Sequence, residues 1–110
     1  MEPISDEDMR ARLAKSREYS LVLLKSTGKR AEPGADAIVW EHGRRNFSLV
    51  QRGVLRIVCP VTDDSGWSGI GVFDASPAEV TRIMADDPGV QAGIFTYEVH
   101  PVRGFPGAAL

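Results

Sequence analysis

Hydrophobic positions recur along the chain with two different periods, and the changes of period divide it into elements. Residues 19–25 form a nearly continuous apolar run of strand length, which is typical of an interior strand covered on both faces. From residue 36 to residue 52 the period becomes 3.6, with Trp40 and Phe47 at the centre of an apolar arc. This pattern predicts a long helix that buries the arc and ends at Gly53.

Two short runs rich in valine and isoleucine follow, at residues 55–61 and 69–73. Polar residues separate them, so they predict an antiparallel hairpin with a longer loop. Pro60 lacks a backbone N–H and therefore favours an edge or bulged position for the first of these strands.

A second helix has clear start and stop signals. Ser76 can cap the first turn, Pro77 suits the first helical position, and Glu79 completes a capping box. The Asp-Asp-Pro-Gly sequence at 86–89 is expected to end this helix, because proline cannot continue it. Residues 94–100 then alternate between apolar and polar side chains, which predicts a final strand.

These elements follow a β-α-β-β-α-β order, preceded by a short predicted helix at residues 5–16. The order predicts a small α+β sandwich with two helices on one face of a four-stranded sheet. The other face would carry Ile57, Ile70 and Val72, which a protein seldom presents to water together. We therefore expect a homodimer that buries this face against a second copy.

Composition and charge narrow the class of protein. The chain has 110 residues, of which 43% are hydrophobic and 25% are charged, as expected for one globular domain. A net charge of -2 lacks the basic excess that binding to nucleic acid or to an anionic membrane requires. No apolar run is long enough to span a membrane, and the acidic N-terminal residues are unlike a secretory signal. With Cys59 as the single cysteine, we expect a cytoplasmic protein without internal disulfides.

Histidine is the side chain that exchanges a proton near neutral pH, which makes His42 and His100 the first candidates for acid–base chemistry. His42 is expected at the rim of the helix's core face, a place that suits a proton carrier. The same place suits a histidine that only hydrogen-bonds backbone or water, and the spacing alone favours this second interpretation. Asp87 helps to end the second helix, and it could also orient an imidazole.

Three further residues are candidates for contact with a substrate. Arg45 is close to His42 on the helical wheel and could hold a carboxylate or an enolate. His100 belongs to a polar row on the face assigned to the dimer, where pairing across the interface or a ligand cavity would satisfy it. Cys59 is interpreted as a small apolar filler in a Val-rich strand, and as a reactive thiol only beside a cation or a helix terminus.

Signatures of the common cofactor and hydrolase sites are missing from the sequence. Residues 66–71 carry glycines in reversed dinucleotide-binding spacing, and neither a phosphate loop nor a Gly-x-Ser-x-Gly elbow occurs. No His-x-x-x-His motif or carboxylate cluster marks a metal site. We therefore predict a protein that uses no cofactor and no metal.

Several short strings, in their order and spacing, resemble the YciI-like (YCII-related) family. They are His-Gly-Arg-Arg-Asn-Phe at 42–47, Gly-Val-Leu at 53–55, Cys-Pro-Val at 59–61, Asp-Pro-Gly-Val at 87–90 with Ala-Gly at 92–93, and Glu-Val-His-Pro at 98–101. The resemblance spans residues 19–102, which leaves residues 1–18 as an N-terminal helical extension and residues 103–110 as a tail. It implies a ferredoxin-like fold assembled as a dimeric α+β barrel. In that family the proposed active site pairs a helix histidine with the aspartate of an Asp-Pro element, which corresponds to His42 and Asp87 here.

A characterised branch of the family removes chloride from a chlorinated, hydroxylated aromatic ring, which implies lyase-type proton chemistry. This chain departs from the family pattern at Cys59, which stands where the family has a glycine before proline. We expect a small enzyme of lyase or isomerase type in which His42 transfers a proton and Asp87 orients it. Arg45 or His100 would hold a small polar or aromatic substrate. The alternative is a non-catalytic small-molecule-binding or interaction module, because a fold does not determine a function.

Overall fold

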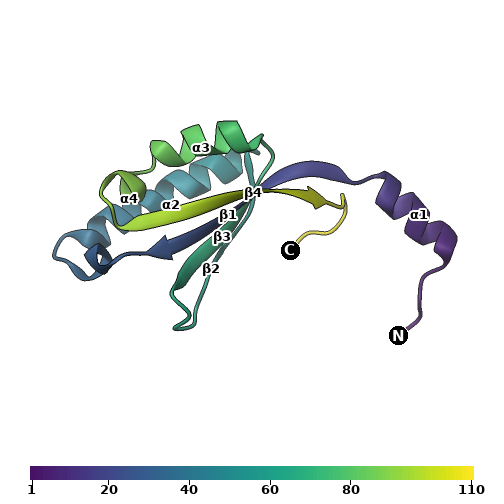
Figure 1. The fold of residues 1–110 in the computed structure, drawn as a ribbon, viewed down its shortest axis with the longest axis horizontal. Coiled ribbons are helices and arrows are strands. Elements are labelled where there is room, and N and C mark those ends of the chain that lie inside the picture. Colours follow the sequence, from purple (N-terminus) through teal and green to yellow (C-terminus); the bar gives the residue numbers. More distant parts are fainter.

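A four-stranded antiparallel sheet forms the centre of the protein, in a computed structural model that describes all residues from 1 to 110. The strand order is β2-β3-β1-β4. The bounds are β1 (Arg17–Ser26), β2 (Leu55–Pro60), β3 (Trp67–Phe73) and β4 (Phe95–Gly104). Three helices lie on one face of this sheet (Figure 1): α2 (Ala35–Gln51), α3 (Pro77–Ala85) and α4 (Pro88–Gln91). The architecture is α+β and compatible with a ferredoxin-like fold.

The core lies between the sheet and these helices. Alternate side chains of each strand point towards the helices, and hydrophobic residues of the sheet and of the helices meet there. Its most deeply buried members are Val22, Leu55, Phe73, Val80 and Ile94. Burial of each such side chain contributes about 1.5–3 kcal/mol to folding, so this layer fixes how α2 and α3 sit on the sheet.

The prediction that α2 buries the arc centred on Trp40 and Phe47 is wrong. Trp40 and Phe47 are 70% and 71% exposed, whereas Ala35 and Leu49 are buried and Ile38 packs against the core. The helix carries apolar residues on two arcs, and its contacts with β2 and α4 decide which arc faces inward. Periodicity along α2 contains no information about those contacts.

The start of α3 confirms the prediction from its capping residues. The Ser76 hydroxyl accepts a hydrogen bond from the Glu79 N–H at 3.2 Å, and Pro77 occupies the first helical position. The predicted stop at 86–89 has a second function, because α3 ends at Ala85 and Asp87 is the N-cap of the additional short helix α4. The segment between β1 and α2 contains a short 3₁₀ helix, η1 (Gly28–Ala31).

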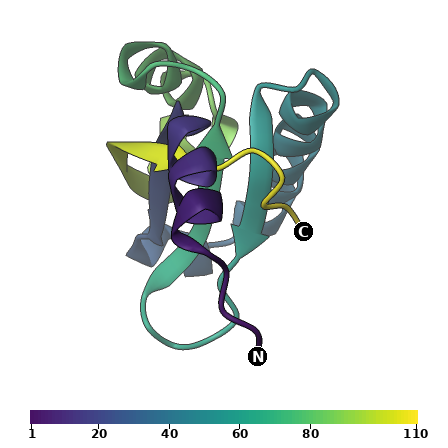
Figure 2. The same cartoon turned by 90° about the vertical axis from the view of Figure 1, so that its right-hand side faces the viewer.

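The first and last strands pair over their whole length and extend beyond the rest of the sheet. β1 pairs with β4 from Arg17 opposite Gly104 to Ser26 opposite Phe95, so β4 is longer than predicted. Pro101 is accommodated because β4 is an edge strand. The predicted N-terminal helix, α1 (Asp6–Ala14), precedes β1 and projects away from the sheet (Figure 1), and it lies in front of the sheet in the view of Figure 2. It buries none of its residues.

No helix covers the second face of the sheet (Figure 1). Register pairs bring together on this face the partly exposed Leu21, Leu23, Ile57, Ile70 and Val72. Ile70 is 37% exposed in the single chain. None of the helices has the length and apolar character that crossing a membrane would require.

Candidate active site

His42 and Asp87 form an ion-pair-type contact between α2 and the start of α4. The Nδ1 atom of His42 lies 2.8 Å from Oδ1 and 2.9 Å from Oδ2 of Asp87. The His42 side chain is 12% exposed and that of Asp87 only 1%. The structure therefore brings together two residues that are 45 positions apart in the sequence.

Local backbone geometry holds the Asp87 carboxylate in place. Its Oδ2 atom accepts hydrogen bonds from the N–H groups of Gly89 at 3.0 Å and Val90 at 3.1 Å. These N–H groups belong to the first turn of α4 and have no partner within the helix, so Asp87 satisfies them as the N-cap. The same carboxylate thus begins α4 and contacts the imidazole.

The surroundings of Asp87 favour its ionised form. Burial is the largest single influence and by itself would raise the pKa of Asp87. The hydrogen bond and charge of His42, the Val90 N–H and the charge of Arg45 together outweigh burial and hold the pKa below its ordinary value of 3.8. At neutral pH the group is a carboxylate that can only accept hydrogen bonds.

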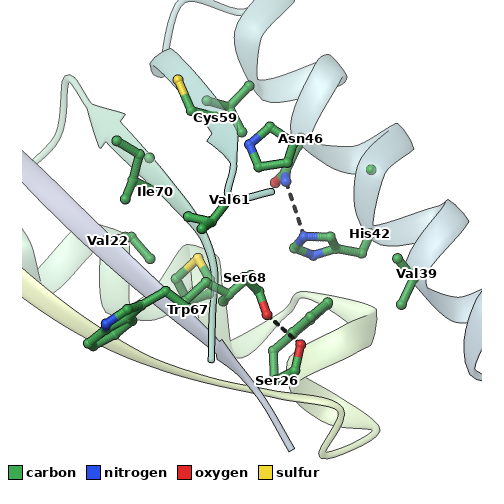
Figure 3. Close-up of a pocket in the computed structure, with 18 of the residues that line it drawn as sticks. Val22, Ser26, Val39, His42, Asn46, Cys59, Val61, Trp67, Ser68 and Ile70 are labelled. Atoms are coloured by element: carbon green, nitrogen blue, oxygen red, sulfur yellow. Dashed lines mark hydrogen bonds between the residues drawn. The ribbon is translucent and has the colours of Figure 1, made fainter. Parts of the chain in front are cut away.

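The ionised carboxylate determines which nitrogen of His42 carries the proton. Because Asp87 can only accept, Nδ1 must be the donor, and Nε2 of the neutral ring presents a lone pair that can accept a hydrogen bond or a proton. The Nδ2 atom of Asn46, one helical turn further along α2, lies 3.3 Å from Nε2 (Figure 3). A protonated Nδ1 backed by a carboxylate, with an unprotonated Nε2, is the arrangement of a general base.

Phe95 packs against the imidazole. The two ring centroids are 4.7 Å apart with planes inclined by 45°. Phe95 stands at the start of β4, and its ring lies close to Gly89 of α4. A Cβ atom added to Gly89 would lie only 2.5 Å from this ring. The imidazole is therefore held by an aromatic ring as well as by the Asp87 carboxylate.

A cavity of about 760 Å³ opens beside this pair, between α2 and the β2–β3 hairpin. Of its 25 lining residues 13 are hydrophobic, and the volume lies within the usual range for small-molecule sites. His42 and Asn46 contribute polar groups from α2 (Figure 3). A second polar point is the hydrogen-bonded hydroxyl pair of Ser26 and Ser68, at the ends of β1 and β3.

The other candidate residues occupy three different places. Cys59 lines the cavity from β2. Arg45 does not line it, and its Nη1 lies 3.8 Å from Oδ1 of Asp87. His100 lies on the uncovered face of the sheet, where its Nε2 is 3.4 Å from Oε1 of Glu98, so the structure does not bring it to this cavity.

Several residues of the site were not among the sequence candidates. Asn46 had a usable signal, because it lies four residues after His42 and therefore on the same side of the helix. Phe95, Ser26 and Ser68 had none, since only strand pairing and the course of the hairpin bring them here.

Comparisons with known proteins leave the chain without an assigned family. No family model matches it, and no curated protein matches it either. Within the chain, no group of three or more histidine, cysteine, aspartate or glutamate side chains is arranged to hold a metal ion. The arrangement of His42 and Asp87 beside the cavity is therefore the basis for a functional proposal.

Proposed function

We propose that this protein is a small cofactor-independent enzyme of lyase or isomerase type, in which His42 transfers a proton to and from a small polar or aromatic molecule. The observation that carries this proposal is the buried, ionised Asp87 held against Nδ1 of His42 at the edge of an open cavity. An anion in this position favours the imidazolium that forms when Nε2 takes a proton.

The chemistry follows from the two ring nitrogens. Nε2 accepts a proton from an acidic C–H bond of the bound molecule, and the electron pair of that bond moves into an adjacent carbonyl or unsaturated system. Asp87 stays ionised and accepts the hydrogen bond from Nδ1 throughout, so the ring has this partner in both its neutral and its positive form. Return of the proton to another carbon completes an isomerisation. In an elimination the leaving group departs with its bonding electron pair, and Nε2 then releases its proton to the leaving group or to water. The positive charge of Arg45, 3.8 Å from Oδ1 of Asp87, helps to keep this carboxylate ionised.

We also propose membership of the YciI-like family, assembled as a dimeric α+β barrel through the uncovered sheet face. The support is the strand order, the resemblance of the strings at 42–47 and 87–90, and the apolar side chains on that face. In such a dimer His100 and Glu98 would lie at the interface and would have to pair or stay hydrated. A cytoplasmic location is proposed on the single unpaired cysteine, Cys59.

A non-catalytic small-molecule-binding or interaction module is the second candidate. It is favoured by the largely apolar lining of the cavity and by the hydrogen bond that already engages Nε2 of His42. A binding protein needs a shaped cavity and a fixed polar contact, and both are present without any requirement for proton transfer.

Proton transfer can be tested without knowing the physiological substrate. A panel of small cyclic ketones, enones and lactones is incubated with the protein in deuterium oxide, and C–H exchange is followed by proton NMR. For a compound whose exchange the parent protein accelerates, His42→Ala should lower the rate by about a hundredfold or more, because it removes the base.

The matched control is His100→Ala, which removes the other histidine outside the cavity and should leave the exchange rate unchanged. Equal rates for His42→Ala and the parent protein would overturn the mechanism. A compound that binds the parent and His42→Ala equally well and is exchanged by neither would support the binding module instead.

A further inference from the structure

Asn46 contacts the nitrogen of His42 at which the proposed chemistry occurs. Its Nδ2 lies 3.3 Å from Nε2, and its amide makes no other side-chain hydrogen bond. The residue is half-buried in α2 and lines the cavity next to His42. Asn46 therefore contacts the proton acceptor at the wall of the cavity.

Proton uptake reverses what Nε2 requires from this neighbour. The neutral ring presents a lone pair at Nε2 and needs a donor, which the Nδ2–H of Asn46 supplies. The protonated ring presents an N–H at Nε2 and needs an acceptor. Among side chains of this size, a primary amide carries both a donor and an acceptor at opposite ends of one rotatable group. Because no second hydrogen bond holds the amide of Asn46, it is free to turn.

We propose that Asn46 is a positioning residue whose amide turns over when His42 gains a proton, donating from Nδ2 before the transfer and accepting at Oδ1 afterwards. The inference rests on the proposed function of His42 as a proton carrier. Its consequence is that Nε2 has a partner in both protonation states, so the imidazole keeps its orientation between Asp87 and the cavity. A substrate would compete with the Asn46 amide for Nε2 while the proton moves.

The charged groups around His42 do not supply this contact. Asp87 meets the ring at Nδ1, and Arg45 lies 3.8 Å from Oδ1 of Asp87. The remaining titratable groups of the cavity lie on η1, β2 and the β2–β3 loop, and they are Arg30, Cys59, Asp63 and Asp64. None of them is hydrogen-bonded to the imidazole. The partner of Nε2 is Asn46.

NMR of the isotope-labelled protein tests the two orientations directly. Asn46 is the only asparagine, so its side-chain resonances are assigned without ambiguity, and the exposed Gln51 and Gln91 serve as internal references. The His100→Thr variant leaves His42 as the only histidine. Couplings across hydrogen bonds are then measured on both sides of the pH at which the ring takes up its proton.

We expect a nitrogen–nitrogen coupling between Asn46 Nδ2 and His42 Nε2 when the ring is neutral. When the ring is protonated, this coupling should vanish and a coupling between Nε2 and the Asn46 Cγ should replace it. The references should show neither change. Absence of the first coupling, or an acid form without the second, would overturn the inference.

Turnover provides a second measurement on any compound found by deuterium exchange. Asn46→Leu keeps the size of the side chain and removes both polar atoms, so kcat should fall roughly ten- to a hundredfold with little change in KM. Gln51→Leu, on the same helix but away from the cavity, should change neither. An unchanged kcat for Asn46→Leu overturns this inference while leaving His42 as the base. If His42→Ala and Asn46→Leu both keep the activity of the parent protein, the proposed function itself is overturned.

Discussion

The carboxylate of Asp87 holds the backbone of α4 and also contacts the side chains of the site. Oδ2 accepts from the backbone N–H groups of Gly89 and Val90, and Oδ1 is the nearer oxygen to both His42 and Arg45. A carboxylate with this much hydrogen bonding in a buried place contributes to stability as well as to the site. Substitution of Asp87 therefore affects both.

The lowered pKa of Asp87 has a consequence for stability at low pH. A group whose pKa is lower in the folded state stabilises that state above its unfolded pKa, and this contribution is lost as the pH falls through the folded value. For Asp87 the unfolded value is 3.8 and the folded value is lower. At about pH 5, Asp87→Asn should lower the free energy of unfolding by about 1–3 kcal/mol, since the amide loses the charged contacts to His42 and Arg45.

Urea unfolding of the parent protein and of Asp87→Asn at a series of pH values checks this expectation. The difference in free energy should be largest above the ordinary pKa of an aspartate, 3.8, and should shrink as the pH falls through the lowered pKa of the folded state and the parent carboxyl becomes protonated. A difference that stays constant over this range would contradict the assignment of an ionised Asp87.

At the scale of elements, α2 and α4 meet at the site and each contains a glycine. A Cβ atom added to Gly43 in α2 would have no atom within 4 Å, whereas one added to Gly89 in α4 would approach the ring of Phe95 to 2.5 Å. The close approach of α4 to β4 therefore depends on Gly89. The ring that it meets is the one packed against His42.

Alanine substitutions at these two glycines should have opposite effects. Gly43→Ala should raise the free energy of unfolding by about 0.5–1 kcal/mol, because alanine loses less backbone entropy in a helix. Gly89→Ala should lower it by about 1–3 kcal/mol, because Phe95 must move. Urea denaturation of the two variants measures both values. Destabilisation by Gly43→Ala equal to that by Gly89→Ala would contradict the packing described for α4.

At the scale of the whole molecule, the sheet is covered on one face only. Leu21, Leu23, Ile57, Ile70 and Val72 remain partly exposed on the other face of the isolated chain. Exposed apolar area of this kind is usually buried in an interface. The proposed homodimer is the assembly in which each copy covers this face of the other.

Sedimentation velocity at micromolar concentration tests the assembly. The parent protein should sediment as a dimer, and Ile70→Lys should sediment as a monomer because it places a charge in the centre of the buried face. The control is Trp40→Lys, which changes a large hydrophobic and more exposed side chain on α2, and this variant should remain dimeric. A parent protein that sediments as a monomer would remove the proposed interface.

The sequence by itself determined the elements of this protein and their order. Ser5 and Ser76 cap the two helices that were expected to begin after them, and Phe95, Tyr97 and Val99 alternate with polar residues along β4 as predicted. These features depend on interactions within a few residues, so the local sequence contains them. The additional helix α4 was missed because the Asp-Pro-Gly sequence at 87–89 was interpreted as the end of one helix and not as the start of another.

Tertiary structure alone decided how α2 is rotated and what it places in the cavity. Trp40 and Phe47 are larger than Leu49 and Ile38, yet contacts with β2 and α4 turn the smaller pair inward. The resemblance pointed to His42 and Asp87, but their separation of 45 residues in the sequence does not say how far apart the two side chains lie in space. The rotation of a helix and the meeting of distant side chains depend on packing between elements, and this packing is a property of the whole folded chain.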